Sequence, residues 1–217
     1  MLFRDRIDAG LQLAHRLSEY AGRADVVVVG LPRGGVPVAA EVAKSLRAPL
    51  DIMVVRKLGV PGHEELALGA IAPNDALVVN PGVMARLQDP EEALREAIER
   101  ESKELQRREQ EYQAARPALD LKGKMVIVVD DGLATGATMH AAVQALKHHA
   151  VAECVVAVPV TATDARRSFE DKGVEVISLL EPEEFRAVGE HYDDFTQTTD
   201  QEVLQRLHEA ASSTDSL

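Results

Sequence analysis

Short apolar runs alternate with helical patterns along most of the chain. Each run is rich in Val and Ile and too short for a buried helix, so we predict five buried strands: Val26–Val29, Ile52–Val55, Met125–Val129, Val155–Val158 and Val174–Leu179. Helical periodicity predicts helices between them: Val36–Leu46, Met139–Leu146 and Asp164–Lys172. This alternation is typical of an α/β fold in which helices flank a twisted parallel sheet. Ligands bind beyond the carboxyl ends of such strands, which directs attention to residues 30–35, 56–66 and 130–138.

Two segments interrupt this alternation. Leu66–Ala72 and Ala76–Asn80 flank the turn residues Pro73-Asn74-Asp75, which predicts a hairpin. Asp89-Pro90-Glu91-Glu92 combines an N-cap, a proline at the first helical position and an acid at N3, and predicts a long inserted helix over 89–116. The helix has a narrow apolar stripe: Leu94, Ile98, Leu105 and Tyr112. In one interpretation the stripe packs along the domain edge, and in the other it forms a homodimer contact.

Composition excludes several classes of protein. The 217 residues are 46% apolar, which suits one domain with a sizeable core. The single cysteine, Cys154, excludes an internal disulfide and suits a reducing compartment. The net charge of −12 argues against general affinity for nucleic acid or anionic lipid. With no long apolar run for a secretory signal or a membrane span, we expect a cytoplasmic protein.

The strongest chemical signal is the segment Val126–Thr138, Val-Ile-Val-Val-Asp-Asp-Gly-Leu-Ala-Thr-Gly-Ala-Thr. Its apolar strand ends in Asp130 and Asp131, and adjacent carboxylates are costly to desolvate unless cations or hydroxyl donors meet them. The two hydroxyls of a ribose would supply donors, and Mg²⁺ would offset the charge. Small residues at 134–137 allow backbone N–H groups at a helix N-terminus to approach a phosphate. Together these features indicate a ribose 5-phosphate site.

This segment resembles the signature with which type I phosphoribosyltransferases bind 5-phosphoribosyl-1-pyrophosphate (PRPP), and its ending is closest to the adenine-type version. The resemblance implies that Asp130 and Asp131 face the ribose hydroxyls and contact Mg²⁺ indirectly, through those hydroxyls or water. It also implies that five residues hold the 5-phosphate: Ala134, Thr135, Gly136, Ala137 and Thr138.

A second match is Gly30-Leu31-Pro32-Arg33-Gly34-Gly35, another strand-to-helix turn. Its glycines permit unusual backbone angles and close approach of an anion. It resembles the pyrophosphate loop of the family, in which a basic residue precedes a glycine pair and a peptide N–H faces the leaving group. The resemblance assigns pyrophosphate contacts to Arg33, Gly34 and Gly35.

The segment after the second predicted strand begins with Arg56 and Lys57, two cations that suit pyrophosphate. The residues that follow, Lys57–Glu65, are rich in Gly, Pro and charge, which favours a mobile lid that is poorly ordered without ligand. In the family this region precedes or forms the loop that closes over the reaction.

Near the carboxyl end, the order Pro182-x-x-Phe185-x-x-Val188-Gly189 resembles the hood of 6-oxopurine phosphoribosyltransferases, where an aromatic ring stacks on the base. The resemblance makes Phe185 and the nearby Tyr192 candidate acceptor contacts, with core packing as the alternative for each. We therefore expect one domain over residues 1–217 with a core, a small hood and a polar tail: about 24–180, about 181–200 and 210–217.

Taken together, the resemblance covers about residues 26–200 and implies a Mg²⁺-dependent phosphoribosyltransferase. Such an enzyme transfers phosphoribose from PRPP to a nitrogenous acceptor, such as a nucleobase, and releases pyrophosphate. Arg33 and Lys57 would join the two aspartates in catalysis. Ala134 stands where 6-oxopurine enzymes carry an acid, so a base would come from Glu64, Glu65 or Glu190, or none is needed.

The long inserted helix is more similar to a generically named bacterial group of the family than to its purine enzymes. A protein that senses PRPP without turnover is the alternative function. A third possible function is that of a ribose-phosphate hydrolase or kinase-like enzyme on the same fold.

Overall fold

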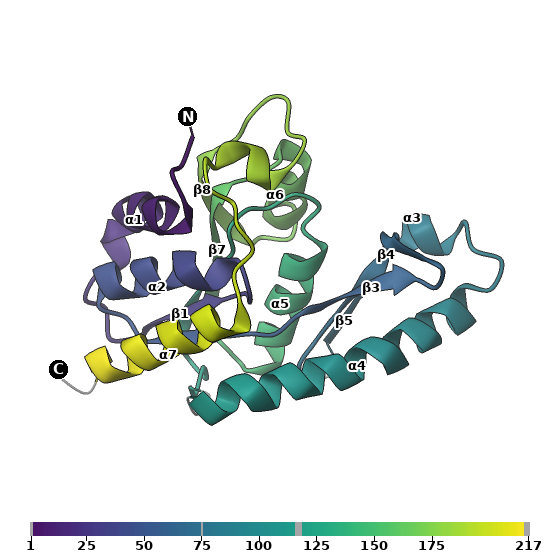
Figure 1. Ribbon diagram of the computed structural model, residues 1–217, viewed down its shortest axis with the longest axis horizontal. Coiled ribbons are helices and arrows are strands. Elements are labelled where there is room, and N and C mark those ends of the chain that lie inside the picture. Colours follow the sequence, from purple (N-terminus) through teal and green to yellow (C-terminus); the bar gives the residue numbers. More distant parts are fainter. Residues whose placement is uncertain (1, 75, 116–118, 215–217) are drawn as a thin grey trace.

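The computed structural model describes residues 2–74, 76–115 and 119–214. A parallel sheet with helices on both faces forms the body of the molecule, and an arm of strands and a long helix extends from one side (Figure 1). Among the described residues, no helix combines the length and apolar character needed to cross a membrane.

The central sheet has five parallel strands in the order β2-β1-β6-β7-β8. Their bounds are β1 Val26–Gly30, β2 Leu50–Ile52, β6 Met125–Val129, β7 Glu153–Val160 and β8 Glu175–Leu180. The predicted strand Ile52–Val55 is shifted, because Met53 makes the last backbone bond to the sheet, to the Gly30 carbonyl oxygen, and the chain then leaves it. Met53–Val55 remain buried, which explains their apolar pattern.

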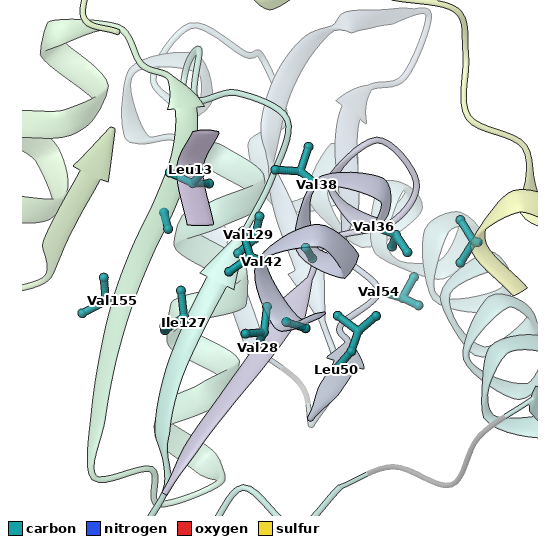
Figure 2. Close-up of a cluster of buried hydrophobic side chains, with 14 of the residues drawn as sticks. Leu13, Val28, Val36, Val38, Val42, Leu50, Val54, Ile127, Val129 and Val155 are labelled. Carbon is teal, nitrogen blue, oxygen red and sulfur yellow. The ribbon is translucent and has the colours of Figure 1, made fainter. Parts of the chain in front are cut away.

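Alternate residues of the central strands enter two separate hydrophobic cores. Val26 and Val28 of β1 lie in one core, whereas Val27 and Val29 lie in the other. Figure 2 shows the first core, where Val28, Ile127 and Val155 from three strands lie near side chains of the overlying helices. Burial of both faces explains why these strands are continuously apolar in the sequence.

Helices cover both faces of the sheet. The face of the first core carries α1 (Arg6–Arg16), α2 (Gly35–Leu46) and α7 (Asp200–Thr214). The opposite face carries α5 (Ala137–His148) and α6 (Thr163–Glu170). Two short 3-10 turns, η1 and η2, span Ser18–Tyr20 and Val188–His191. Helix α7 continues to Thr214 and so includes the first part of the predicted polar tail at 210–217, whereas residues 215–217 lie outside the described chain.

The arm is a three-stranded antiparallel sheet, β3 (Arg56–Val60), β4 (His63–Ala72) and β5 (Ala76–Val79). The predicted hairpin is confirmed as β4–β5, although Asp75 of its turn lies outside the described residues. The predicted lid over Lys57–Glu65 is corrected: most of it is the paired β3–β4 hairpin rather than a loop. A short α3 (Pro81–Met84) then leads to α4 (Pro90–Ala115).

Helix α4 packs its stripe against the molecule's own arm and helix α7. Leu105 is 7% exposed and Tyr112 is 1% exposed, so neither side chain is available to a second copy. Packing along the domain edge is therefore confirmed for this part of the stripe, and the dimer contact through these two residues is wrong. The predicted helix end at Arg116 lies outside the described residues.

Candidate functional site

The strand order places the candidate site at the point where the chain reverses its direction across the sheet. Strand β1 is followed by β2 on one side, and the later strands β6 to β8 add to the other side. The carboxyl ends of β1 and β6 lie side by side, with Gly30 opposite Val129. Crevices for ligands form at such switch points in open α/β sheets. Both motifs predicted from the sequence begin there.

The two loops are in close contact. The Leu31 N–H donates to the Val129 carbonyl oxygen at 2.9 Å, which ties the first loop to the end of β6. A methyl group on Gly34 would overlap the Asp131 carboxylate. One on Gly35 would lie 2.7 Å from the Val129 carbonyl oxygen and 2.8 Å from Cα of Asp130. The glycine pair is therefore required by the aspartates, and the sequence prediction that these segments form one site is consistent with their packing.

The two aspartates have unequal surroundings. Burial, and then the neighbouring Asp131 carboxylate, raise the pKa of Asp130 well above its ordinary value. Burial also raises the pKa of Asp131, but the Arg6 guanidinium opposes that rise. Oδ1 of Asp130 accepts the Asp131 backbone N–H at 2.9 Å. A cation or a pair of hydroxyl donors at this position would stabilise the charged forms of both groups.

Arg6, the first residue of α1, is a member of the site that the sequence pattern did not reveal. Its Nε and Nη2 each lie 2.8 Å from Oδ2 of Asp131, and its side chain is 11% exposed. Nη1 donates to the Thr196 carbonyl oxygen at 2.7 Å, and the guanidinium lies 4.0 Å from the centre of the Phe195 ring. No local motif surrounds Arg6, so only the folded chain identifies it.

The segment predicted to hold the 5-phosphate forms the turn into α5. Gly136 has φ of 76°, a conformation that favours glycine. Helix α5 starts at Ala137 without a side-chain cap, which leaves its first N–H groups for a ligand. Ala134 and Thr135 are exposed, and Thr138 is half-buried. This arrangement is suited to an anion.

The hood contacts the aspartate loop through Tyr192. Its hydroxyl donates to the Asp131 carbonyl oxygen at 2.6 Å, and its ring packs against Phe3 and Phe195. Tyr192 is 5% exposed, so the structure places it as a support for Asp131 rather than on an open surface. Phe185 is half-buried and stacks on His191, with ring centres 5.8 Å apart.

The candidate cations occupy different surroundings. Arg33 lies on the glycine loop, with Nη1 3.6 Å from Oδ2 of Asp200, and the Pro32–Arg33 peptide bond is cis. Arg56 donates to Glu101 of α4 at 2.7 and 2.9 Å, so an acid of the arm already binds it. Lys57 is exposed on β3. Of the three, Arg33 lies on the loop that packs against the aspartates.

The three candidate bases are not gathered around the aspartates by any described contact. Glu64 is exposed in the β3–β4 hairpin and accepts the Gly62 N–H at 3.2 Å, and backbone hydrogen bonds lower its pKa. Glu190 is exposed in the hood. The side chain of Glu65 lies outside the described part of the structure.

Comparison with known protein families identifies the family to which the chain belongs. A family model described as "Phosphoribosyl transferase domain" matches residues 4–194, which include both loops and most of the hood. The chain belongs to the phosphoribosyltransferase family. The family resemblance drawn from the two loop motifs is thereby confirmed.

Two relatives from Mycobacterium tuberculosis, "Putative phosphoribosyl transferase MT0597" and "Putative phosphoribosyl transferase Rv0571c", are each 50% identical over 210 residues. Each match covers 96% of this chain and 47% of the relative. The chain thus spans about half the length of these curated relatives.

Solved structures show the same fold. TT1426 from Thermus thermophilus is 41% identical, with a TM-score of 0.81 over 96% of this chain and 99% of that one. The AQ2163 protein from Aquifex aeolicus is 14% identical, with a TM-score of 0.52 over 94% and 85%, and shows the fold alone. The expected type I phosphoribosyltransferase fold is confirmed.

Proposed function

We propose that the protein is a Mg²⁺-dependent phosphoribosyltransferase, which transfers phosphoribose from PRPP to a nitrogenous acceptor and releases pyrophosphate. One observation carries the proposal: Asp130 and Asp131 lie directly against Gly34 and Gly35 at the switch point of the sheet. Two carboxylates suited to a ribose diol thus lie beside a glycine loop suited to an anion. Membership of the family supports the same reaction.

In this proposal the two carboxylates hold the ribose. Each accepts a hydrogen bond from a ribose hydroxyl, and their negative charge stabilises the positive charge that develops on the sugar ring as the bond at C1 breaks. The Arg6 guanidinium favours the ionised form of Asp131 and orients its carboxylate. The uncapped start of α5 binds the 5-phosphate through backbone N–H groups, with Thr135 and Thr138 as further donors.

The leaving group lies on the side of the glycine loop. Arg33 and the backbone of the glycine loop bind the pyrophosphate and stabilise the charge that it acquires. Lys57, exposed on β3, adds a second cation from the base of the arm. Arg56 contributes less directly, because Glu101 already binds its guanidinium.

The donor set fits Mg²⁺ that arrives with PRPP. Within residues 2–74, 76–115 and 119–214, no three His, Cys, Asp or Glu side chains group into a metal site. Two carboxylates do meet, at Asp130 and Asp131, and Mg²⁺ commonly binds through one or two carboxylates, waters and substrate phosphates. These aspartates would hold the ion through water or the ribose hydroxyls. When bound, the ion neutralises charge on the pyrophosphate.

One observation favours sensing of PRPP without turnover as a second candidate. Ala134 is exposed at the position where 6-oxopurine enzymes carry an acid, and it cannot act on an acceptor nitrogen. A phosphoribosyl acceptor that needs no base, such as an amine, is compatible with Ala134, whereas a sensor needs no acceptor at all.

Calorimetry and a pyrophosphate-release assay test the two functions. We expect PRPP to bind only weakly without Mg²⁺, and pyrophosphate to be released with one member of a panel of purines, pyrimidines and small amines. Binding without release across the panel would favour the sensor. No binding of PRPP at millimolar concentration with Mg²⁺ present would contradict both functions.

A further inference from the structure

Helix α7 contacts the cation of the pyrophosphate loop. Nη1 of Arg33 lies 3.6 Å from Oδ2 of Asp200, the first residue of α7, and the two side chains are 26% and 32% exposed. This separation is too long for a hydrogen bond, so the attraction between the two charges leaves the guanidinium N–H groups available to a ligand. Asp200 also lies beyond residue 194, where the match to the family ends.

The Asp200 carboxylate is itself held in place by α4. The Tyr112 hydroxyl donates to Oδ1 of Asp200, and the Tyr112 side chain is almost fully buried. Burial, and then this hydrogen bond, raise the pKa of Tyr112, so the hydroxyl keeps its proton at neutral pH. One oxygen of Asp200 is therefore fixed by the inserted helix, while the other faces Arg33.

The position of Asp200 does not depend on its own side chain. Thr199 caps α7: its Oγ1 accepts the Glu202 N–H at 3.1 Å, and Glu202 accepts the Thr199 N–H at 2.7 Å. This reciprocal pair is a capping box, which fixes the start of the helix. Replacement of Asp200 by Asn should thus leave α7 in place.

We propose that Asp200 is a positioning residue for the pyrophosphate side of the reaction, and that Tyr112 holds Asp200 in turn. The proposal rests on the proposed function. An arginine that is oriented before the ligand arrives loses less conformational freedom on binding. Because the ion pair is long and partly exposed it is weak, and a pyrophosphate with several negative charges displaces it readily. The inserted helix and the C-terminal helix would thereby act on a loop to which neither belongs.

A double-mutant cycle tests this role, with calorimetry of inorganic pyrophosphate in the presence of Mg²⁺. We expect Asp200→Asn to weaken binding about threefold to tenfold, a size typical of coupled neighbours. Tyr112→Phe should have a smaller effect, because the charge of Asp200 remains. In an Arg33→Ala background, Asp200→Asn should have no effect. Asp171→Asn, an equal charge change at the exposed residue that follows α6, serves as the control.

A measurement without ligand separates positioning from other roles. Nitrogen-15 relaxation of the Arg33 Nε–H group should show greater mobility in Asp200→Asn and Tyr112→Phe than in the wild type. Unchanged mobility would overturn the positioning role of Asp200 but not the proposed function. The same holds if Asp200→Asn weakens binding equally in the wild type and in the Arg33→Ala background. Tighter pyrophosphate binding in Asp200→Asn would also overturn it, and would identify Asp200 as a competing anion. If the wild type bound neither pyrophosphate nor PRPP, the proposed function would fail as well.

Discussion

At the scale of single residues, the two adjacent aspartates differ in what they cost the fold. Asp130 is half-buried beside another carboxylate, whereas Asp131 is bound by Arg6. An acid whose pKa is raised in the folded state takes up protons more readily than in the unfolded chain, so its charge at neutral pH lowers stability. That cost falls mainly on Asp130.

The same variant type should therefore have opposite effects at the two positions. We expect Asp130→Asn to raise the melting temperature at pH 7 by a few degrees, since about 1 kcal/mol corresponds to about 2–4 °C at this size. Asp131→Asn should lower it by a similar amount, because the largely buried Arg6 guanidinium then loses its charged partner. Both should weaken PRPP binding. Thermal unfolding and calorimetry measure the two effects, and equal melting shifts of one sign would contradict the assignment.

Phe185 offers a test of the acceptor side. Its ring is half-buried and stacked on His191, and an aromatic platform for a base contributes about 1–3 kcal/mol. Phe185→Ala should raise the KM for a planar heterocyclic acceptor about tenfold to a hundredfold, with little change in PRPP affinity. Steady-state kinetics beside a melting curve measure this. A drop in stability with equal losses for both substrates would show that Phe185 only packs the hood.

The residues that could be predicted from the sequence are those that share a local motif. Asp130 and Asp131 end an apolar run, and Arg33 precedes a glycine pair, so type and spacing were enough. Arg6 and Asp200 reach the site from the two ends of the chain. Nothing in their immediate neighbours signals that role, because their partners are set by tertiary packing.

At the scale of elements, helix α5 contains a group that titrates in a useful range. Burial, and then nearby Lys172, lower the pKa of His140 to about 4, and its ring stacks on Phe169 at 3.8 Å. A histidine in the unfolded chain has a pKa of about 6.5. Below that pH the unfolded chain binds a proton that the folded chain does not, so stability falls as pH drops from about 6.5 towards about 4.

Replacement of His140 by Gln should flatten that part of the profile. We expect the melting temperature of the wild type to fall more steeply than that of His140→Gln between pH 6.5 and pH 4, because Gln cannot bind the extra proton. Thermal unfolding across this range, with an NMR titration of the His140 ring, provides the measurement. Parallel profiles, or a ring that titrates near pH 6.5, would contradict the predicted effect.

The arm contains a hairpin where the composition of the sequence predicts a mobile loop. Glycines and charges over Lys57–Glu65 suggested a mobile loop, but a methyl group on Gly59 would lie 2.6 Å from the Glu64 carbonyl oxygen. Gly59 thus permits two strands to approach closely. Leu58 and Val60 are buried against the rest of the molecule, which gives the hairpin apolar anchors. Gly59 is thus a site of close packing, and the sequence pattern alone cannot distinguish a closely packed hairpin from a mobile loop.

At the scale of the whole molecule, the family domain and its additions meet at one site. Both loops and most of the hood fall within residues 4–194, whereas α7 follows that range. The chain spans about half the length of the curated relatives that it matches. Residues outside the matched domain, such as Asp200, nevertheless reach the pyrophosphate loop.

The pairing of β1 with β6 has a consequence for how the molecule forms. Val26 pairs with Met125, and the whole arm lies between them in the chain. Bringing β1 and β6 together restricts the long segment between them, and this loss of chain entropy precedes the strand hydrogen bonds that offset it. The hairpins of the arm join neighbouring residues and therefore close early. During synthesis the glycine loop leaves the ribosome long before the aspartates that it must fit. The arm would therefore fold first, and the phosphate site would be among the last parts of the protein to assemble.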